Sequence, residues 1–308
     1  MSFVLLLVGF IFLIKGADYF VEGSSSIARK FKISPMIIGL TIVAMGTSMP
    51  ELSVSVTSSL IGQNDMSLAN VVGSNMFNVL MVLGVSSLIM NLPIKKDSVK
   101  FDIPFLIGIG ILLLLMLLDL KLGILEGIIL ISIFAFYLWR TLKPMLKKKD
   151  KDTKENEEKN KSMFKMIALS LVGIIGIIIG GDMVVDNASK IAEMFGMSQN
   201  LIGLTIVAVG TSLPEFVTSV MAIKKGENEI AIGNVVGSNI FNILLILGVS
   251  SIVNPLMVDV VGLIDTLFMI ASSVLLYLFV RKNKNLNRYQ GVVFILLYVG
   301  YIIYTIIR

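Results

Sequence analysis

Cysteine and histidine are both absent from this chain of 308 residues. Without cysteine there are no disulfides and no thiol catalysis, and without either residue the usual zinc sites cannot form. The absence of histidine also excludes a Ser-His catalytic triad. The chain is instead rich in apolar residues, since 56% of it is hydrophobic, against roughly 45–50% in soluble domains. The composition favours a membrane protein over the two soluble domains that the length alone would allow.

Apolar runs that reach about 20 residues, enough to cross a bilayer as a helix, recur along the whole chain. They predict an all-α polytopic membrane protein with ten transmembrane helices. The predicted spans are residues 2–22, 35–60, 66–90, 101–119, 123–142, 163–188, 200–223, 229–253, 259–280 and 288–307. The first run is followed by further spans and has no small-residue cleavage pattern, so we expect no separate signal peptide.

Lysine and arginine are distributed unevenly among the predicted loops. One set of alternate loops holds 22 of the 26, and the positive-inside rule places that set in the cytoplasm. We therefore expect a multi-pass protein of the cell membrane with both termini outside. This distribution explains the net charge of +5 better than nucleic-acid binding does. The polar segment 143–162 has mixed charge, which predicts a solvated cytoplasmic linker.

The chain contains an internal repeat with an offset of 164 residues. The segment GLTIVAMGTSMPELSVSV (39–56) matches GLTIVAVGTSLPEFVTSV (203–220) at 13 of 18 positions. The segment NVVGSNMFNVLMVLGVSSLI (70–89) matches NVVGSNIFNILLILGVSSIV (234–253) at 14 of 20 positions. Each half has five predicted spans, so the second half enters the membrane from the opposite side. This predicts two inverted five-helix repeats, 1–142 and 163–308, joined by the linker 143–162, an arrangement common in transporters.

Each repeat carries a proline and a glutamate inside an apolar span. Pro50 has no N–H and its ring presses on the carbonyl of Gly46, so we expect the helix to open there and free carbonyl oxygens. Pro214 and Gly210 repeat the arrangement. In lipid, free carbonyls are costly unless a polar partner, such as a desolvated cation, meets them. A substrate site is therefore predicted near the midplane, where the two broken helices meet.

Polar side chains recur at i, i+4 and i+8 around these breaks, which places them on single helix faces. The stripes are Thr47–Glu51–Ser55 and Asn70–Ser74–Asn78, with copies Thr211–Glu215–Ser219 and Asn234–Ser238–Asn242. Ser48 and Ser212 each directly follow the threonine of their stripe. Every candidate ligand is an oxygen, which suits calcium, sodium and magnesium, and a flexible cage of six to eight oxygens favours calcium over magnesium. Helix packing is the alternative role for the small residues, but packing does not need the two carboxylates.

A carboxylate at the centre of a bilayer costs about 2.5–3.5 kcal/mol on insertion scales. A bound cation would offset that cost for Glu51 and Glu215, and so would protonation. The other acidic residues of these regions, Asp18, Glu22, Asp182 and Asp186, fall near the predicted ends of the first and sixth spans. Anchoring at the membrane surface is the simpler role for them, and ion access to the site is the alternative.

The segments GTSMPE (46–51) and GTSLPE (210–215), each followed by GSNMFN (73–78) or GSNIFN (237–242), resemble the α-repeats of the sodium/calcium exchanger family. That family belongs to the calcium/cation antiporter superfamily. The short linker is similar to that of prokaryotic members, which lack the calcium-sensing domain of animal exchangers. The resemblance implies two inverted five-helix units, with alternating access by sliding of the first and sixth helices across the other eight.

The resemblance also implies a calcium site around Glu51 and Glu215, flanked by sodium sites. The residues that match family ligands by motif position are Thr47, Ser48, Ser74, Asn78, Thr211, Ser212 and Ser238, with the main-chain carbonyls of Ala44 and Ala208. Asn242 matches a position that is aspartate in potassium-dependent exchangers and in some archaeal members. The asparagine here argues against potassium co-transport.

We therefore predict a secondary antiporter, not an enzyme, that exchanges Na⁺ for Ca²⁺ at overlapping sites. The two ions and the lipid bilayer are the expected partners, with no cofactor, nucleic acid or obligatory protein partner. The nearest alternative is H⁺/Ca²⁺ antiport through the same glutamates, although proton-coupled relatives tend to lack the hydroxyl-rich GTS. An intramembrane protease would have no use for the extra oxygen ligands. A passive cation channel fits less well, because a twofold repeat around a charged midplane site favours alternating access.

Overall fold

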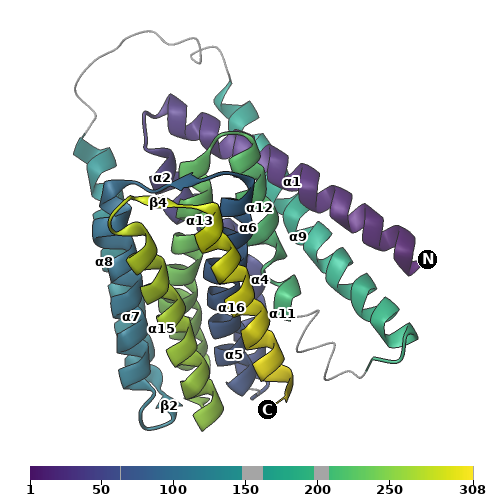
Figure 1. Cartoon of the computed structure of the whole chain (residues 1–308), viewed down its shortest axis with the longest axis vertical. Coiled ribbons are helices and arrows are strands. Elements are labelled where there is room, and N and C mark those ends of the chain that lie inside the picture. Colours follow the sequence, from purple (N-terminus) through teal and green to yellow (C-terminus); the bar gives the residue numbers. More distant parts are fainter. Residues whose placement is uncertain (63, 148–161, 198–207, 308) are drawn as a thin grey trace.

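The computed structural model describes residues 1–62, 64–147, 162–197 and 208–307, and these residues form a helical bundle (Figure 1). Five helices are continuous: α1 (Ser2–Lys30), α8 (Ile124–Lys147), α9 (Met163–Met194), α15 (Val260–Val280) and α16 (Arg288–Ile307). Three more contain a stretch of π-helix: α5–η2–α6 (Asn64–Met76, Phe77–Val82, Leu83–Ile89), η3–α7 (Ser98–Asp102, Ile103–Met116) and α13–η6–α14 (Asn228–Phe241, Asn242–Ile246, Leu247–Val253).

Two segments are interrupted. The first consists of α2 (Pro35–Ile38), η1 (Gly39–Val43) and α3 (Ala44–Thr47), followed after a break by α4 (Met49–Leu60). The second consists of α11 (Ala208–Gly210) and α12 (Leu213–Lys224). Among the described residues, eight helices are long and apolar enough to cross a membrane, and the bent segment 35–60 would be a ninth. The first part of the predicted span 200–223 lies outside the described residues, so the count of ten stays a prediction.

The first and sixth spans are longer than predicted. Helix α1 continues to Lys30 and α9 to Met194, whereas the sequence predicted ends near residues 22 and 188. Asp18 and Glu22 therefore lie inside α1, and Asp182 and Asp186 lie inside α9; their position near the membrane ends of these two spans stays a prediction. The extra turns are stabilised by packing, since small residues after position 22 are buried and Gly23 lies against Ser170 and the carbonyl of Met166 in α9.

Helices α1 and α9 form a closely packed pair that crosses the remaining helices obliquely (Figure 1). Glycines allow the two backbones to touch. A Cβ added at Gly173 would lie 2.5 Å from the nitrogen of Phe20, and one added at Gly180 would lie 2.5 Å from the nitrogen of Leu13. Such close approach without side chains is the usual way in which membrane helices gain van der Waals contact.

The remaining helices surround α13–η6–α14, which is almost entirely buried. Two short antiparallel ribbons join the helix ends: β1 (Leu92–Pro93) pairs with β4 (Asn285–Leu286), and β2 (Lys121–Leu122) pairs with β3 (Leu256–Met257). The first residues of β1 and β3 are 164 positions apart, as are those of β2 and β4. The offset found in the sequence therefore extends beyond the duplicated motifs to the placement of the ribbons.

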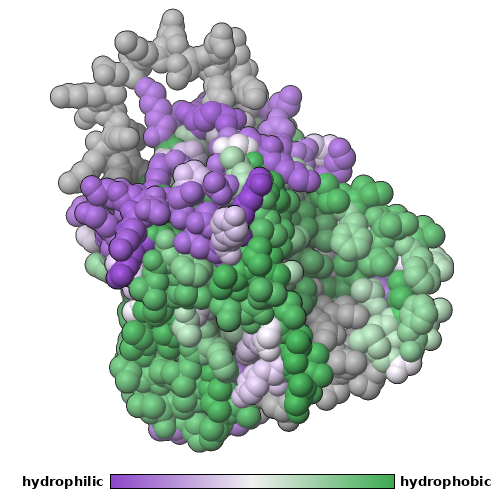
Figure 2. Space-filling model, viewed as in Figure 1, coloured by the Kyte–Doolittle hydropathy of each residue, from purple (hydrophilic) through white to green (hydrophobic). Residues whose placement is uncertain are grey.

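The surface has the distribution expected for a protein embedded in lipid. Figure 2 shows hydrophobic residues covering the sides of the molecule and hydrophilic residues gathered at the end where β4 lies. Large apolar side chains such as Leu125 on α8 and Phe164 on α9 are largely exposed, at 73% and 81%. The chain is therefore a multi-pass, all-helical membrane protein.

Candidate ion-binding site

The helix breaks predicted at the two prolines are confirmed. Helix α3 ends at Thr47, Ser48 leaves helical geometry with φ −86° and ψ 10°, and α4 restarts at a bend of 48° with Pro50 in its first turn. The second break lies at Ser212, with φ −92° and ψ 4°, directly before α12. Proline is tolerated in a first helical turn because the N–H there has no helical partner, so each proline fixes where its helix restarts.

Glu51 and Glu215 are buried completely, each with 0% of its surface exposed. The Oε1 atom of Glu51 accepts hydrogen bonds from the hydroxyls of Ser74 and Ser212, both at 3.2 Å. The Ser212 hydroxyl also lies 2.9 Å from that of Ser74. The carboxylate of the first break is therefore held by a serine from the second break.

The converse contact is made by Glu215. Its Oε1 atom accepts hydrogen bonds from Ser48 at 2.8 Å and from Ser238 at 3.4 Å. Neither Glu51 nor Glu215 forms an ion pair with a lysine or arginine among the described residues. Two carboxylates thus lie in one hydrogen-bonded network, and no lysine or arginine of the described residues neutralises them.

Four oxygen atoms at this place accept no hydrogen bond from any described residue although they are buried. They are Oε2 of Glu51, Oε2 of Glu215, Oδ1 of Asn78 and Oδ1 of Asn242. Leaving a buried acceptor unsatisfied costs about 1–3 kcal/mol, and more for a charged group. Four such acceptors together have the chemistry of a site for a hard cation.

The orientation of the two amides follows from residues that the sequence analysis missed. Asn78 donates its Nδ2 to Oδ1 of Asn239 at 3.0 Å, and Asn242 donates its Nδ2 to Oδ1 of Asn75 at 3.0 Å. These bonds occupy the amino groups and leave the carbonyl oxygens unpaired. Asn75 and Asn239 also donate to each other's main-chain carbonyls, at 3.2 and 3.1 Å. Their identity at the offset of 164 residues was the available signal.

Stretches of π-helix coincide with both asparagines, because Asn78 lies in η2 and Asn242 begins η6. A π-helical turn inserts an extra residue into the helix and is frequent at functional sites. Each insertion changes which side chains of its helix face inward after this point.

The predicted threonines each contact an asparagine of the other repeat. Thr47 donates to Oδ1 of Asn234 at 3.0 Å, and Thr211 donates to Oδ1 of Asn70 at 3.4 Å. Asn70 in turn donates to the carbonyl oxygen of Glu51 at 3.3 Å, and Asn234 makes the equivalent bond to the carbonyl oxygen of Glu215 at 3.3 Å. These contacts fix the first turn after each break.

The two main-chain candidates differ in what the structure says of them. The carbonyl oxygen of Ala44 lies 3.3 Å from the hydroxyl of Thr47 and 3.4 Å from that of Ser238, so it lies in the same network. Ala208 begins α11, directly after residues outside the described part of the chain, and its carbonyl as a ligand stays a prediction.

Comparison with known proteins gives the family of this chain. The family profile described as "Sodium/calcium exchanger protein" matches residues 1–143 and 165–307. This chain belongs to the sodium/calcium exchanger family. The resemblance seen in the duplicated motifs is thereby confirmed.

Individual proteins match over most or nearly all of the chain. The sodium/calcium exchanger MaX1 of Methanosarcina acetivorans is 33% identical over 341 residues, covering 98% of this chain and 97% of its own length. The inner membrane protein YrbG of Escherichia coli is 35% identical, covering 83% of this chain and 81% of its own length. The solved structure of the sodium-calcium exchanger NCX_Mj, soaked with Na⁺ and Ca²⁺, superposes with a TM-score of 0.86 at 34% identity, covering 98% of this chain and 97% of that one.

Members of this family are transporters rather than enzymes. As a member, this chain is a cation/Ca²⁺ antiporter. The buried carboxylates and amide oxygens described above lie in the motifs through which the resemblance was first seen.

Proposed function

We propose that this antiporter exchanges Na⁺ for Ca²⁺ by alternating access, and that both ions use Glu51 and Glu215. The observation that carries the proposal is the set of four buried, unsatisfied oxygens contributed by these glutamates and by Asn78 and Asn242. Two carboxylates balance the charge of one Ca²⁺ ion. Because the same oxygens serve both ions, Na⁺ and Ca²⁺ compete, and competition at one site couples their movements.

The full set of proposed ligands is larger than the four unsatisfied oxygens. Calcium takes six to eight oxygens at 2.3–2.6 Å in flexible geometry, and sodium is likewise bound by oxygen. Hydroxyls and main-chain carbonyls would complete the shells: Thr47, Ser48, Ser74, Thr211, Ser212, Ser238, Ala44 and Ala208. The proposal needs no cofactor and no obligatory protein partner.

Sodium is favoured over the proton as the counter-ion by the hydroxyl-rich GTS before each proline, since a proton carrier needs only the carboxylates. The unsatisfied Oδ1 atoms of Asn78 and Asn242 can coordinate either Ca²⁺ or Na⁺. H⁺/Ca²⁺ antiport through the glutamates remains the second candidate.

Alternating access rests on two inverted five-helix units, which we propose for residues 1–142 and 163–308 with a linker at 143–162. Reciprocal contacts support this relation: Ser48 donates to Glu215 while Ser212 donates to Glu51, and Asn75 and Asn239 exchange equivalent bonds. We also propose that the chain lies in the cell membrane with its lysine-rich end in the cytoplasm and both termini outside.

The test is uptake of ⁴⁵Ca²⁺ into proteoliposomes that contain the purified protein. One set is preloaded with Na⁺ and diluted into Na⁺-free buffer, and a matched set carries only a pH gradient. We expect uptake in the first set alone. Uptake driven by the pH gradient would replace sodium with the proton in this mechanism.

Glu51→Gln and Glu215→Gln should each abolish the Na⁺-driven uptake, because each removes one of the two charges that balance Ca²⁺. Glu126→Gln is the matched control, since Glu126 only accepts a bond from the nitrogen of Gly123 at the start of α8 and glutamine retains an acceptor. Full exchange in either of the first two variants would contradict the proposed site.

A further inference from the structure

We propose that Asn75 and Asn239 are positioning residues on which the cation affinity of the site depends, and that Asn239 is the more important of the two. The inference rests on the proposed function, since it concerns the amide oxygens of Asn78 and Asn242 that would meet the ion. The two positioning residues are not ligands themselves. The oxygen and the nitrogen of each of their side-chain amides already form hydrogen bonds, and neither residue has an unsatisfied buried atom.

The orientation of these amides is fixed by two main-chain carbonyls. The oxygen and nitrogen of a side-chain amide are alike in shape, so the hydrogen-bond partners determine which way the oxygen points, and a main-chain carbonyl can only accept. The carbonyl of Asn239 lies 3.2 Å from Nδ2 of Asn75, and the carbonyl of Asn75 lies 3.1 Å from Nδ2 of Asn239. Each carbonyl therefore requires the amino group, and each side-chain oxygen must point the other way.

Those side-chain oxygens in turn orient the two proposed ligands. Oδ1 of Asn75 accepts from Nδ2 of Asn242, and Oδ1 of Asn239 accepts from Nδ2 of Asn78, both at 3.0 Å. Turning either ligand amide over would set two oxygens against each other and would present an amino group to the cation. Each ligand is thus oriented by the opposite repeat, across 167 and 161 residues of sequence.

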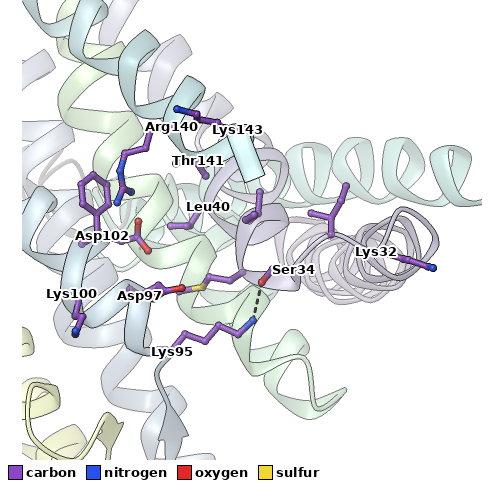
Figure 3. A pocket seen from close by; sticks show the side chains of 15 residues that line it. Lys32, Ser34, Leu40, Lys95, Asp97, Lys100, Asp102, Arg140, Thr141 and Lys143 are labelled. Atoms are coloured by element: carbon purple, nitrogen blue, oxygen red, sulfur yellow. Dashed lines mark hydrogen bonds between the residues drawn. The ribbon is translucent and has the colours of Figure 1, made fainter. Parts of the chain in front are cut away.

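Burial keeps bulk water away from these amides. All four asparagines are at most 1% exposed. The cavity at the lysine-rich end of the molecule (Figure 3) is lined by other residues, among them Arg140 and Asp102. An amide in contact with water turns over at little cost, because water both donates and accepts. Here the partners within the described part of the chain hold the orientation, so the loss of one partner should release a ligand oxygen.

The two ligand amides differ in the number of acceptors that hold them. Nδ2 of Asn242 also donates to the hydroxyl of Ser74 at 3.2 Å. Nδ2 of Asn78 has Asn239 as its one acceptor among the described residues. Loss of Asn75 therefore leaves Asn242 with a second acceptor, whereas loss of Asn239 leaves Asn78 with none. This difference makes Asn239 the more important positioning residue.

The experiment measures equilibrium binding of ⁴⁵Ca²⁺ to the purified full chain in detergent, and its displacement by Na⁺. Leucine has nearly the shape of asparagine but neither donates nor accepts. We expect Asn239→Leu to raise the half-saturating concentration of one or both ions about 10–100-fold, the usual cost of losing a group that orients a metal ligand. Asn75→Leu should cause a smaller rise. Equal rises, or no rise for Asn239→Leu, would overturn the proposal.

A double-mutant cycle separates positioning from helix packing, the simpler role for polar side chains between membrane helices. Asn78→Ala removes the oxygen that Asn239 orients, so adding Asn239→Leu should cause little further rise. Additive rises would contradict the proposal. Asn187→Leu is the matched control, because Asn187 is 5% exposed and donates only to the carbonyl of Met183 in its own helix. Its half-saturating concentrations should equal those of the wild type.

Asn239→Asp is the second variant, for the case that leucine prevents folding. A carboxylate presents an acceptor to Asn78 in either orientation, although it cannot donate to the carbonyl of Asn75. The half-saturating concentrations should therefore not rise, and a rise of about tenfold would overturn the proposal. Wild-type protein that binds no Ca²⁺ would refute the proposed function itself. Binding that is the same in the wild type and in Asn239→Leu would refute only the positioning role.

Discussion

Ser74 and Ser238 occupy identical motifs 164 residues apart, yet the structure predicts that their substitution by alanine has unequal effects. The hydroxyl of Ser74 donates to Glu51 at 3.2 Å, lies 2.9 Å from the hydroxyl of Ser212 and accepts from Asn242 at 3.2 Å. The three contacts of Ser238, with Glu215, Ala44 and Thr47, are all 3.4 Å long. Contacts of that length are near the limit for a hydrogen bond between oxygens.

These distances set the expected magnitudes. A hydrogen bond to a charged group contributes about 1.5–3 kcal/mol and one between neutral groups about 0.5–1.5 kcal/mol. Ser74→Ala removes one of the first kind and two of the second, part of which water replaces, so we expect a loss of about 2 kcal/mol in the free energy of Ca²⁺ binding. That corresponds to about a 30-fold rise in the half-saturating Ca²⁺ concentration. Ser238→Ala should cost about 0.5 kcal/mol, or roughly twofold.

The assay is Na⁺-driven ⁴⁵Ca²⁺ uptake as a function of external Ca²⁺. Ser86→Ala is the control, because the Ser86 hydroxyl is buried and has no hydrogen-bond partner among the described residues. Equal shifts for Ser74→Ala and Ser238→Ala would refute the reasoning, since the motifs are alike and only the geometry distinguishes them.

Three further outcomes follow from the packing and charges. Gly173→Ala places a Cβ 2.5 Å from the nitrogen of Phe20, so we expect the free energy of unfolding to fall by about 1–3 kcal/mol and the melting temperature to fall with it. Gly108→Ala is the control and should be neutral, because no atom lies within 4 Å of the added Cβ. Lys225→Ala breaks a partly exposed ion pair with Asp18, whose two side chains are 27% and 30% exposed; the cost should be below about 1 kcal/mol, and the difference in melting temperature should vanish in high salt. Calcium uptake with equal pH on both sides should fall as pH is lowered, because protonation removes the negative charge that binds the cation; uptake that is flat down to strongly acidic pH would contradict carboxylate ligands.

Several elements of the fold were predictable because the physics behind them is local. A span is recognisable from the length of its apolar run, and both helix breaks follow from prolines that lack an N–H. The ends of the first and sixth spans were not predictable in this way. The turns after residue 22 are rich in serine and read as a loop, but they are buried against α9, and that burial depends on a partner helix about 150 residues away.

Part of the candidate site was likewise predictable from local sequence, and part depended on tertiary packing. The stripes of hydroxyl, amide and carboxylate were visible in the sequence because side chains four residues apart share a helix face. Asn75 and Asn239 were missed, since they lie one step away from those stripes. Only the packing of the two halves shows that they hold the amino groups of Asn242 and Asn78 and so direct the carbonyl oxygens away from their donors.

By itself, the sequence determined the membrane class, the duplication, the places where the helices break and the oxygen chemistry of the candidate site. These properties depend on composition and on contacts within a few residues. The tertiary structure alone decided which serine holds which glutamate, since Ser48 and Glu215 are 167 residues apart, and it decided which oxygens remain unsatisfied. Such pairings depend on how two distant helices pack, and local periodicity carries no information about that distance.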